Sequence, residues 1–283
     1  KYYTLEEYQT AIKDNQTDKD GKLVFLYASN KEDQYTYIQN AKEKGYDVLL
    51  MDGYLDTPFV NFLEQKNPDN RYVRVDADVV EKLIPKAQAK ESHLEAAEKE
   101  DLNAIFKAQL PKEGGMYMVQ FEALGEESEP VVITRSEFMR RMKDMAAMNP
   151  EMSFYGAMGD QFNVVVNSDH KLIHQILNDE KQKLEAKVQP IQLQIKEQED
   201  LKIEINNLNK EVKPEDIPSV DKDRIADLDK KITAFKEEKN ILFAEYGKEN
   251  PLIGQMIDLA LLANGLLKGE ALHTFVKRSV NLL

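Results

Sequence analysis

The sequence predicts a mixed fold, an α/β unit followed by an α+β part, and three observations carry this prediction. Short apolar runs alternate with helical segments over the first 85 residues, which is typical of a small three-stranded parallel α/β/α unit. Apolar residues at three- and four-residue spacing on both sides of a Pro-containing break predict a long helical hairpin over 179–247. The last stretch, 250–283, reads as a pair of strongly apolar helices.

The first unit opens with a helix start, because Thr4 and Glu7 have the spacing of a capping box. Three short apolar runs that suit buried strands follow, with helical segments between them. The expected strands are 23–27, 47–51 and 71–75, and the expected helices between them are 31–44 and 56–66.

The helix over 56–66 carries more apolar side chains than one sheet face can cover. Phe59, Phe62 and Leu63 cannot all pack on the sheet, so we expect two of them in the core and one partly exposed. An exposed aromatic ring beside Asn61 would be a contact point for a partner.

The segment 86–109 is rich in Ala, Lys and Glu, and it predicts an exposed helix or hinge that links two domains. Beyond it, alternating stretches predict a second small sheet with strands at 116–124, 130–134 and 163–167. We therefore expect domains over 1–85 and 110–283, joined by this helical linker.

A methionine-rich helix lies between the second and third of these strands. At 100° per residue, Phe138, Met142 and Met145 share one stripe, and Met139 and Met148 flank it. Methionine is flexible and polarisable, which suits a surface that accepts varied partners. A Met-rich core face would show the same spacing, and the pattern leaves both interpretations open.

The hairpin over 179–247 carries charges of mixed sign, as on a solvated helical surface. An arm that docks a partner is the alternative, and it would make the chain a coiled-coil scaffold or adaptor.

The first of the last two helices is apolar almost all round over 252–262, whereas a surface helix needs only one apolar stripe. Asn250 and Pro251 suit the helix start, and Gly265 suits the turn between the two helices. Such a pair is either a self-association element or a core hairpin of a monomer.

Composition excludes several function classes. The net charge of −13 and a pI of about 5.0 argue against nucleic acid, and there is no run of eighteen apolar residues for a membrane span. Without Cys, and with four scattered His, we expect no catalytic group and no metal site. A small-molecule enzyme would need a pocket near Ser29 and Asp52, where phosphate-binding glycines are missing.

Four stretches together resemble the heat-shock protein 90 chaperone family in its bacterial form. They are Thr4-Leu-Glu-Glu-Tyr, Lys44-Gly-Tyr-Asp-Val-Leu-Leu-Met with the following Leu55-Asp56, the helix from Phe138 to Met148, and Asp258-Leu-Ala-Leu-Leu-Ala-Asn. The resemblance covers 1–85, 110–178 and 250–283, and 179–247 looks like an insertion to which nothing transfers.

The resemblance implies the C-terminal half of a heat-shock chaperone: the end of the middle domain and the C-terminal dimerisation domain. This part is expected to form a homodimer in the cytoplasm, to bind unfolded or partly folded client proteins, and to have no catalysis or cofactor of its own. ATP and magnesium are expected in an N-terminal domain outside this sequence.

The resemblance also implies site residues. An ungapped match places the apolar client-binding positions of the family's amphipathic helix at Phe138, Met142 and Met145, beside Met139. A second client contact falls at Asn61, where Phe59 stands in for an aromatic that some members carry. The expected dimer residues are Leu252, Met256, Ile257, Leu259, Ala260, Leu262, Leu272, Phe275, Val276 and Val280.

Overall fold

The structure is a computed structural model that describes residues 3–53, 55–87, 92–135, 137–148, 154, 159–210, 212–213 and 217–280. The chain forms two compact units, which are described separately. We call residues 1–93, 110–170 and 255–283 the sheet unit, and residues 94–109 and 171–254 the arm unit. The predicted domain boundaries at 85 and 110 stay a prediction.

The sheet unit begins with α1 (Leu5–Gln16), whose capping box is confirmed. The Glu7 amide donates to the Thr4 hydroxyl at 3.2 Å, and the Thr4 amide donates to the Glu7 carboxylate at 2.8 Å. Two amides at the helix start thus gain partners within the helix itself.

The first sheet is parallel, with the order β2-β1-β3. Its strands are β1 (Leu23–Ala28), β2 (Val48–Leu50) and β3 (Asn70–Arg74). The side chains of β1 alternate between two apolar clusters: Val24 and Leu26 lie in one, and Phe25 and Tyr27 lie in the other. The predicted α/β/α unit is confirmed, with α2 (Tyr35–Glu43), α3 (Asp56–Lys66) and the short α4 (Val80–Leu83) around the sheet.

The second sheet has the order β4-β6-β5, with β6 parallel to β4 and antiparallel to β5. Its strands are β4 (Met116–Glu122), β5 (Val131–Arg135) and β6 (Gln161–Asn167), and α6 (Glu137–Met148) follows β5. The central strand β6 supplies the most buried residues, because both of its sides are paired.

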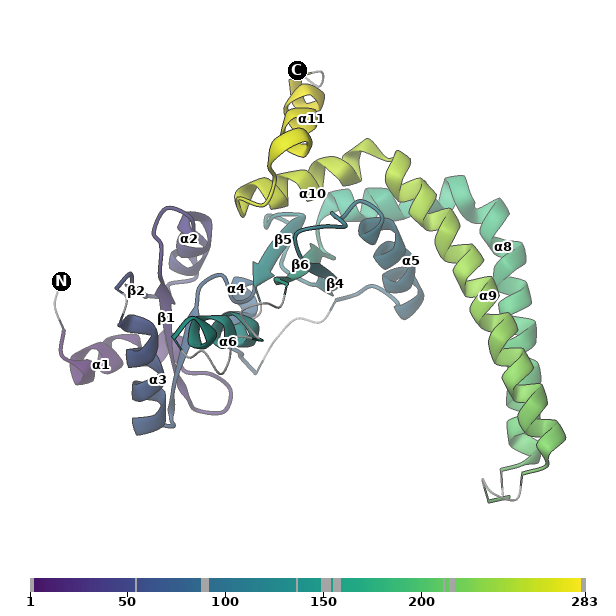
Figure 1. Ribbon diagram of the computed structural model, residues 1–283, viewed down its shortest axis with the longest axis horizontal. Helices are drawn as coiled ribbons and strands as arrows, with labels where there is room; N and C mark the ends of the chain where they lie inside the picture. Colours follow the sequence, from purple (N-terminus) through teal and green to yellow (C-terminus); the bar gives the residue numbers. More distant parts are fainter. Residues whose placement is uncertain are drawn as a thin grey trace. The chain divides into compact units, whose positions relative to one another are not determined.

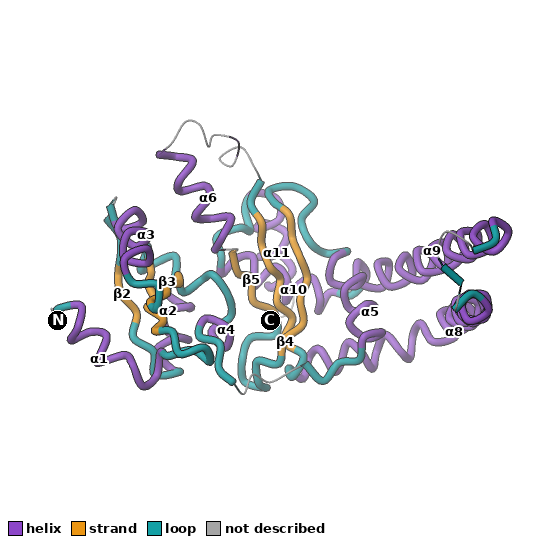
Figure 2. The backbone as a smooth tube through the Cα atoms, turned by 90° about the horizontal axis from the view of Figure 1, so that it is seen from below, coloured by secondary structure: helices purple, strands orange, loops and turns teal. Residues whose placement is uncertain are grey.

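The arm unit consists of α5 (Ala96–Lys107), α8 (Lys171–Leu208) and α9 (Ser219–Glu249). The predicted hairpin is confirmed: α8 and α9 lie side by side in both views (Figures 1 and 2), with Ile191, Ile195 and Ile232 between them. The prediction of an exposed helix over 86–109 is wrong for the second half of α5. Leu102, Ile105 and Phe106 are fully buried there, because α5 packs on α9.

The last two helices are α10 (Pro251–Ala263) and α11 (Gly269–Val280), close to the expected bounds. The Asn250 side chain accepts a hydrogen bond from the Leu252 amide at 3.0 Å, and Gly265 takes a φ of 65° after α10. Among the described residues, none of the helices combines the length and the apolar character that a membrane span requires.

Candidate functional site

Two arginines tie α6 to the first sheet and to α3. The Arg141 guanidinium makes two hydrogen bonds to the Glu64 carboxylate on α3, at 2.5 and 3.2 Å, and a third to the Tyr72 carbonyl oxygen on β3. Arg140 donates to the Tyr27 hydroxyl and lies over its ring, 5.8 Å from the centroid. A two-pronged arginine–carboxylate pair fixes orientation as well as distance. The two helices that carry the predicted client residues are therefore held together.

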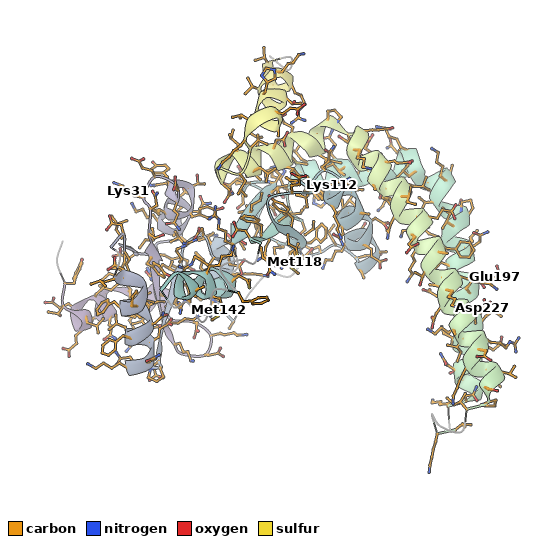
Figure 3. All side chains as sticks on the ribbon, viewed as in Figure 1. Lys31, Lys112, Met118, Met142, Glu197 and Asp227 are labelled. Carbon is orange, nitrogen blue, oxygen red and sulfur yellow. The ribbon has the colours of Figure 1, made fainter. Side chains whose placement is uncertain are left out.

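The methionine stripe of α6 is only partly described. Met139 and Met142 are half-buried, and Ala146 is buried. The side chains of Phe138 and Met145 lie outside the described part of the chain. Figure 3 shows Met142 on α6.

On α3, an apolar stripe faces solvent. Leu55, Phe59 and Phe62 follow each other at spacings of four and three residues and are 78%, 50% and 56% exposed. The expectation that only one of the aromatic or leucine side chains would be exposed is wrong. Val60, only 2% exposed, and the half-buried Leu63 fill the space above the sheet, which leaves both rings outside. A contiguous apolar stripe of this kind is a candidate contact surface.

Asn61 is half-buried on the same helix, two residues after Phe59. The pair between Arg141 and Glu64 thus links the helix that carries Phe59 and Asn61 to the helix that carries Met142, and no contact among these three side chains is seen in the described residues.

The strand β4 adds two exposed residues that sequence reasoning missed, Met116 and Met118, which are 60% and 51% exposed. Figure 3 labels Met118. The Lys143 ammonium on α6 pairs with the Asp160 carboxylate, and the Asp160 carbonyl accepts from the Met116 amide at 2.8 Å. This connection joins α6 to the start of β4. The alternation in 116–124 was visible in the sequence, but the position of β4 at the edge of its sheet was not.

The ten predicted dimer residues divide into three groups by exposure. Four are exposed in the single chain, four are buried within it, and two are intermediate. The exposed ones are Leu259, Leu262, Val276 and Val280; the buried ones are Met256, Ile257, Ala260 and Phe275; the intermediate ones are Leu252 and Leu272.

Hydrogen bonds between polar side chains link α10 to α11. Arg278 on α11 donates to Gln255 at 2.8 Å and to Asp258 at 2.7 Å, both on α10. Gln255 donates in turn to the Ser279 hydroxyl at 3.1 Å. The exposed apolar side chains of the two helices are thus presented on a fixed pair of elements.

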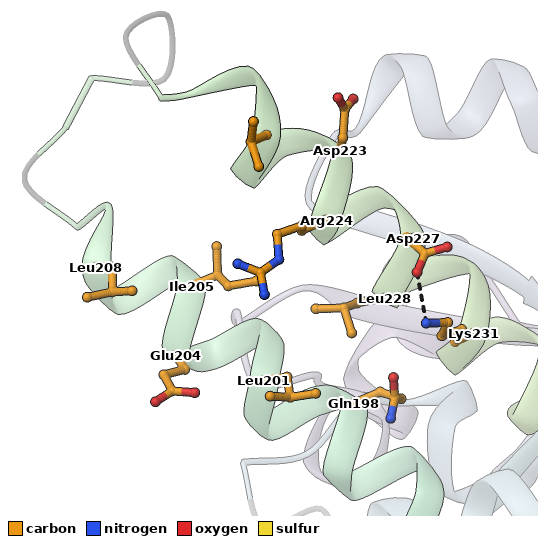
Figure 4. Close-up of a pocket in the computed structure, with 11 residues that line it drawn as sticks. Gln198, Leu201, Glu204, Ile205, Leu208, Asp223, Arg224, Asp227, Leu228 and Lys231 are labelled. Carbon is orange, nitrogen blue, oxygen red and sulfur yellow. Dashed lines mark ion pairs between the residues drawn. The ribbon is translucent and has the colours of Figure 1, made fainter.

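The distal part of the arm holds a groove between α8 and α9 (Figure 4). Leu201, Leu208 and Val220 line it and are 43%, 79% and 64% exposed. The ion pair between Asp227 and Lys231, at 2.9 Å, lies at its rim. This groove is the structural basis for the alternative of a partner-docking arm.

The turn after β1, where a small-molecule site would lie, is occupied by the chain itself. The Gln34 side chain accepts hydrogen bonds from the Ser29 and Asn30 amides at 2.8 and 2.9 Å. Within the described ranges, no three His, Asp or Glu side chains are grouped so that they could hold a metal ion.

No protein-family model matches this sequence. The chain is 52% identical over 284 residues to the chaperone protein HtpG of Bacteroides fragilis (strain YCH46), 51% identical to that of Bacteroides thetaiotaomicron, and 43% identical to that of Porphyromonas gingivalis (strain ATCC 33277). These matches cover 99–100% of this chain and 41–42% of each relative.

The chain therefore spans about two fifths of the length of the curated relatives that it matches, in their C-terminal part. Because the match covers 100% of this chain, it includes 179–247, so these relatives carry a matching sequence in this segment.

Proposed function

This chain is homologous over its whole length to the C-terminal part of HtpG chaperones, and on that premise we propose that it is the client-binding and dimerising part of an ATP-driven chaperone. Its substrates are unfolded or partly folded proteins, and it acts in the cytoplasm as a homodimer. ATP and magnesium bind elsewhere in the whole protein, and this part contributes no catalytic group.

One observation supports client binding above the others. An exposed stripe with two aromatic rings on α3 lies on the same helix as Glu64, and Glu64 is held by Arg141, the residue before Met142 on α6. Unfolded chains expose apolar side chains of varied shape, and adaptable methionines beside rigid rings can accept them. The pair Arg141–Glu64 links the two helices that carry these side chains.

Dimerisation rests on the exposed side chains of α10 and α11. Leu259 and Leu262 on one helix, and Val276 and Val280 on the other, leave apolar area in water that a second copy can cover. A two-fold arrangement would pair the two helices of one subunit with the same two of its partner in a four-helix bundle.

The test of client binding is Met142→Glu, measured as suppression of aggregation of thermally unfolded citrate synthase by light scattering. A carboxylate in an apolar contact is costly to desolvate, so we expect the apparent affinity for the client to fall about tenfold.

The matched control is Leu193→Glu, at an arm residue that is 63% exposed. It introduces the same charge at an exposed apolar site outside α3 and α6 and should leave suppression unchanged. If the wild type and Met142→Glu suppress aggregation equally, α6 is not part of the client site.

A second candidate function is a scaffold that recruits a partner through the arm, and the exposed groove of Leu201, Leu208 and Val220 favours it. Deleting 180–246 separates the two functions: client suppression survives under the chaperone proposal, and partner recruitment is lost under the scaffold proposal.

A further inference from the structure

The outer side of β4 carries backbone groups that the sheet does not use. In the parallel ladder with β6, Met116 and Glu122 bond inward: the Met116 amide donates to the Asp160 carbonyl, and the Glu122 carbonyl accepts from the Ser168 amide, both at 2.8 Å. Every second residue of a strand directs its backbone groups to the same side. The intervening residues therefore direct their N–H and C=O groups away from β6; they are Tyr117, Val119 and Phe121.

The opposite edge of the same sheet is closed by the chain itself. On β5, the outward Arg135 amide donates to the Asp76 carbonyl at 3.0 Å, and the outward Ile133 carbonyl accepts from the Tyr37 hydroxyl. Burial raises the pKa of the Tyr37 phenol, which keeps it a neutral donor. No hydrogen bond within the described residues closes the β4 edge at Tyr117, Val119 or Phe121 in this way.

The sequence of β4 lacks the features that protect sheet edges. Natural edge strands are blunted by Lys, Pro, bulges or short length, because a free row of backbone groups pairs readily with another chain. β4 runs for seven residues, Met-Tyr-Met-Val-Gln-Phe-Glu, and contains neither Lys nor Pro. Its only charge is the final Glu122, which pairs with the Lys82 ammonium at 2.5 Å.

The helix α6, which carries Met142, is tied to the start of the strand that forms this edge, on its β6-facing side. Lys143 of α6 pairs with Asp160, and Asp160 bonds the first residue of β4. Met116 and Met118 stand exposed on one face of the strand, where the side chains of an added strand would lie beside them.

We propose that β4 binds an extended segment of an unfolded protein as an added fourth strand of the second sheet. This inference rests on the proposed function and deepens it, because it states the conformation in which part of the client is held. Backbone hydrogen bonds give such a site affinity without sequence preference, which suits a chaperone that accepts many clients. The methionines of β4 supply apolar contact that adapts to different side chains.

The first experiment is hydrogen exchange of the 283-residue chain, read by NMR or fragmentation mass spectrometry. The probe is reduced and carboxymethylated α-lactalbumin, a permanently unfolded protein. Strand addition should slow exchange of the Tyr117, Val119 and Phe121 amides about tenfold or more when the probe is bound, because each gains an acceptor. Unchanged exchange at all three amides with the probe bound would overturn the proposal.

The second experiment is the variant Val119→Pro, which removes the central N–H group on the outer side of β4. The β4 residues that pair with β6 keep their own N–H groups. Probe affinity, measured by fluorescence anisotropy, should fall about tenfold, which corresponds to about 1.4 kcal/mol. The matched control is Glu126→Pro, at an exposed position in the turn closed by the Ser128 amide and the Gly125 carbonyl. A turn accepts Pro there, and probe affinity should stay at the wild-type value.

The outcomes separate this inference from the proposed function. If Met142→Glu weakens probe binding but the β4 amides stay unprotected, strand addition is wrong and the client site on α6 stands. If neither Met142→Glu nor the β4 amides respond to the probe, both proposals fail. Protection of these amides that grows with protein concentration, without probe, would show that a second copy occupies the edge and would also overturn the inference.

Discussion

At the scale of single residues, the most unusual group is a carboxyl in the arm unit. Glu180 on α8 is only 4% exposed, and its neighbours are Asp101 on α5 and Lys239 on α9, each 8% exposed. The Lys239 ammonium lies 2.6 Å from the Asp101 carboxylate, so one lysine faces two buried acids. Burial first, and then the Asp101 charge, raise the pKa of Glu180 to about 7, while Lys181, Lys239 and Glu98 act more weakly.

The stability of the arm unit should therefore depend on pH. The pKa of Glu180 is higher in the folded chain than its ordinary value of 4.5, so the folded state binds more protons between these two values. Stability should fall as pH rises from 4.5 to 7, by up to about 3 kcal/mol for a shift of this size. Burial also raises the pKa of Asp101, which acts in the same direction.

The variant Glu180→Gln should remove most of this dependence and raise the free energy of unfolding at pH 8 by about 1–3 kcal/mol. Urea unfolding at several pH values, followed by circular dichroism, measures both effects. Glu185→Gln, at an exposed position on the same helix, is the control and should leave the pH profile unchanged. A wild-type profile that is flat between pH 5 and 7 would contradict the proposed titration of Glu180.

At the scale of elements, the arm unit depends on a close approach of α9 to α5. A Cβ built on Gly247 would lie 2.3 Å from the Ile105 carbonyl oxygen, which is far inside van der Waals contact. The Gln109 side chain, just after the end of α5, donates to the Gly247 carbonyl at 2.7 Å and adds a polar contact to α9. Glycine is required here because the obstacle is backbone, which cannot turn aside.

Two opposing effects decide the outcome of Gly247→Ala. Alanine favours a helix by about 1 kcal/mol over glycine, but the added methyl group forces α9 away from α5. We expect the clash to prevail, with a net loss of about 1–3 kcal/mol in the free energy of unfolding, measured by urea titration.

Gly159→Ala is the matched control, because a Cβ there meets nothing within 4 Å and Gly159 has no positive φ. It should change stability by less than about 0.5 kcal/mol. A stabilising Gly247→Ala would show that α9 and α5 pack less closely in solution.

At the scale of the whole molecule, the proposed dimer depends on side chains that the single chain leaves exposed. Leu259 is 50% exposed on α10, so a charge at this position is tolerated in a monomer. In a dimer interface, the same charge would be buried without a partner and would cost several kcal/mol.

Leu259→Asp should therefore yield monomers of 32.5 kDa, whereas the wild type should sediment at twice this mass. Analytical ultracentrifugation at micromolar concentration measures it. The control is Ile241→Asp, at a position on α9 that is 59% exposed, which should keep the wild-type mass. A monomeric wild type would exclude the dimer proposal at this concentration.

The sequence by itself determined the elements of this protein. The capping residues Thr4 and Glu7, the apolar strands and the three-four spacing of the arms depend on local chemistry and side-chain period, so the α/β/α unit and the hairpin were predicted correctly. Lys239 interrupts the apolar repeat of α9, and only the tertiary structure pairs it with Asp101.

Only the tertiary structure decided which surfaces stay open. Whether Phe59 and Phe62 are buried depends on whether Val60 and Leu63 already fill the space above the sheet, and whether β4 is an edge depends on the order of three strands. Both outcomes depend on how elements far apart in the sequence pack: the sheet decides which side of α3 is covered, and the strand order decides which strand is an edge. The exposed residues of α3 and β4 carry the proposed functions, and the local pattern of apolar residues does not distinguish them from a core.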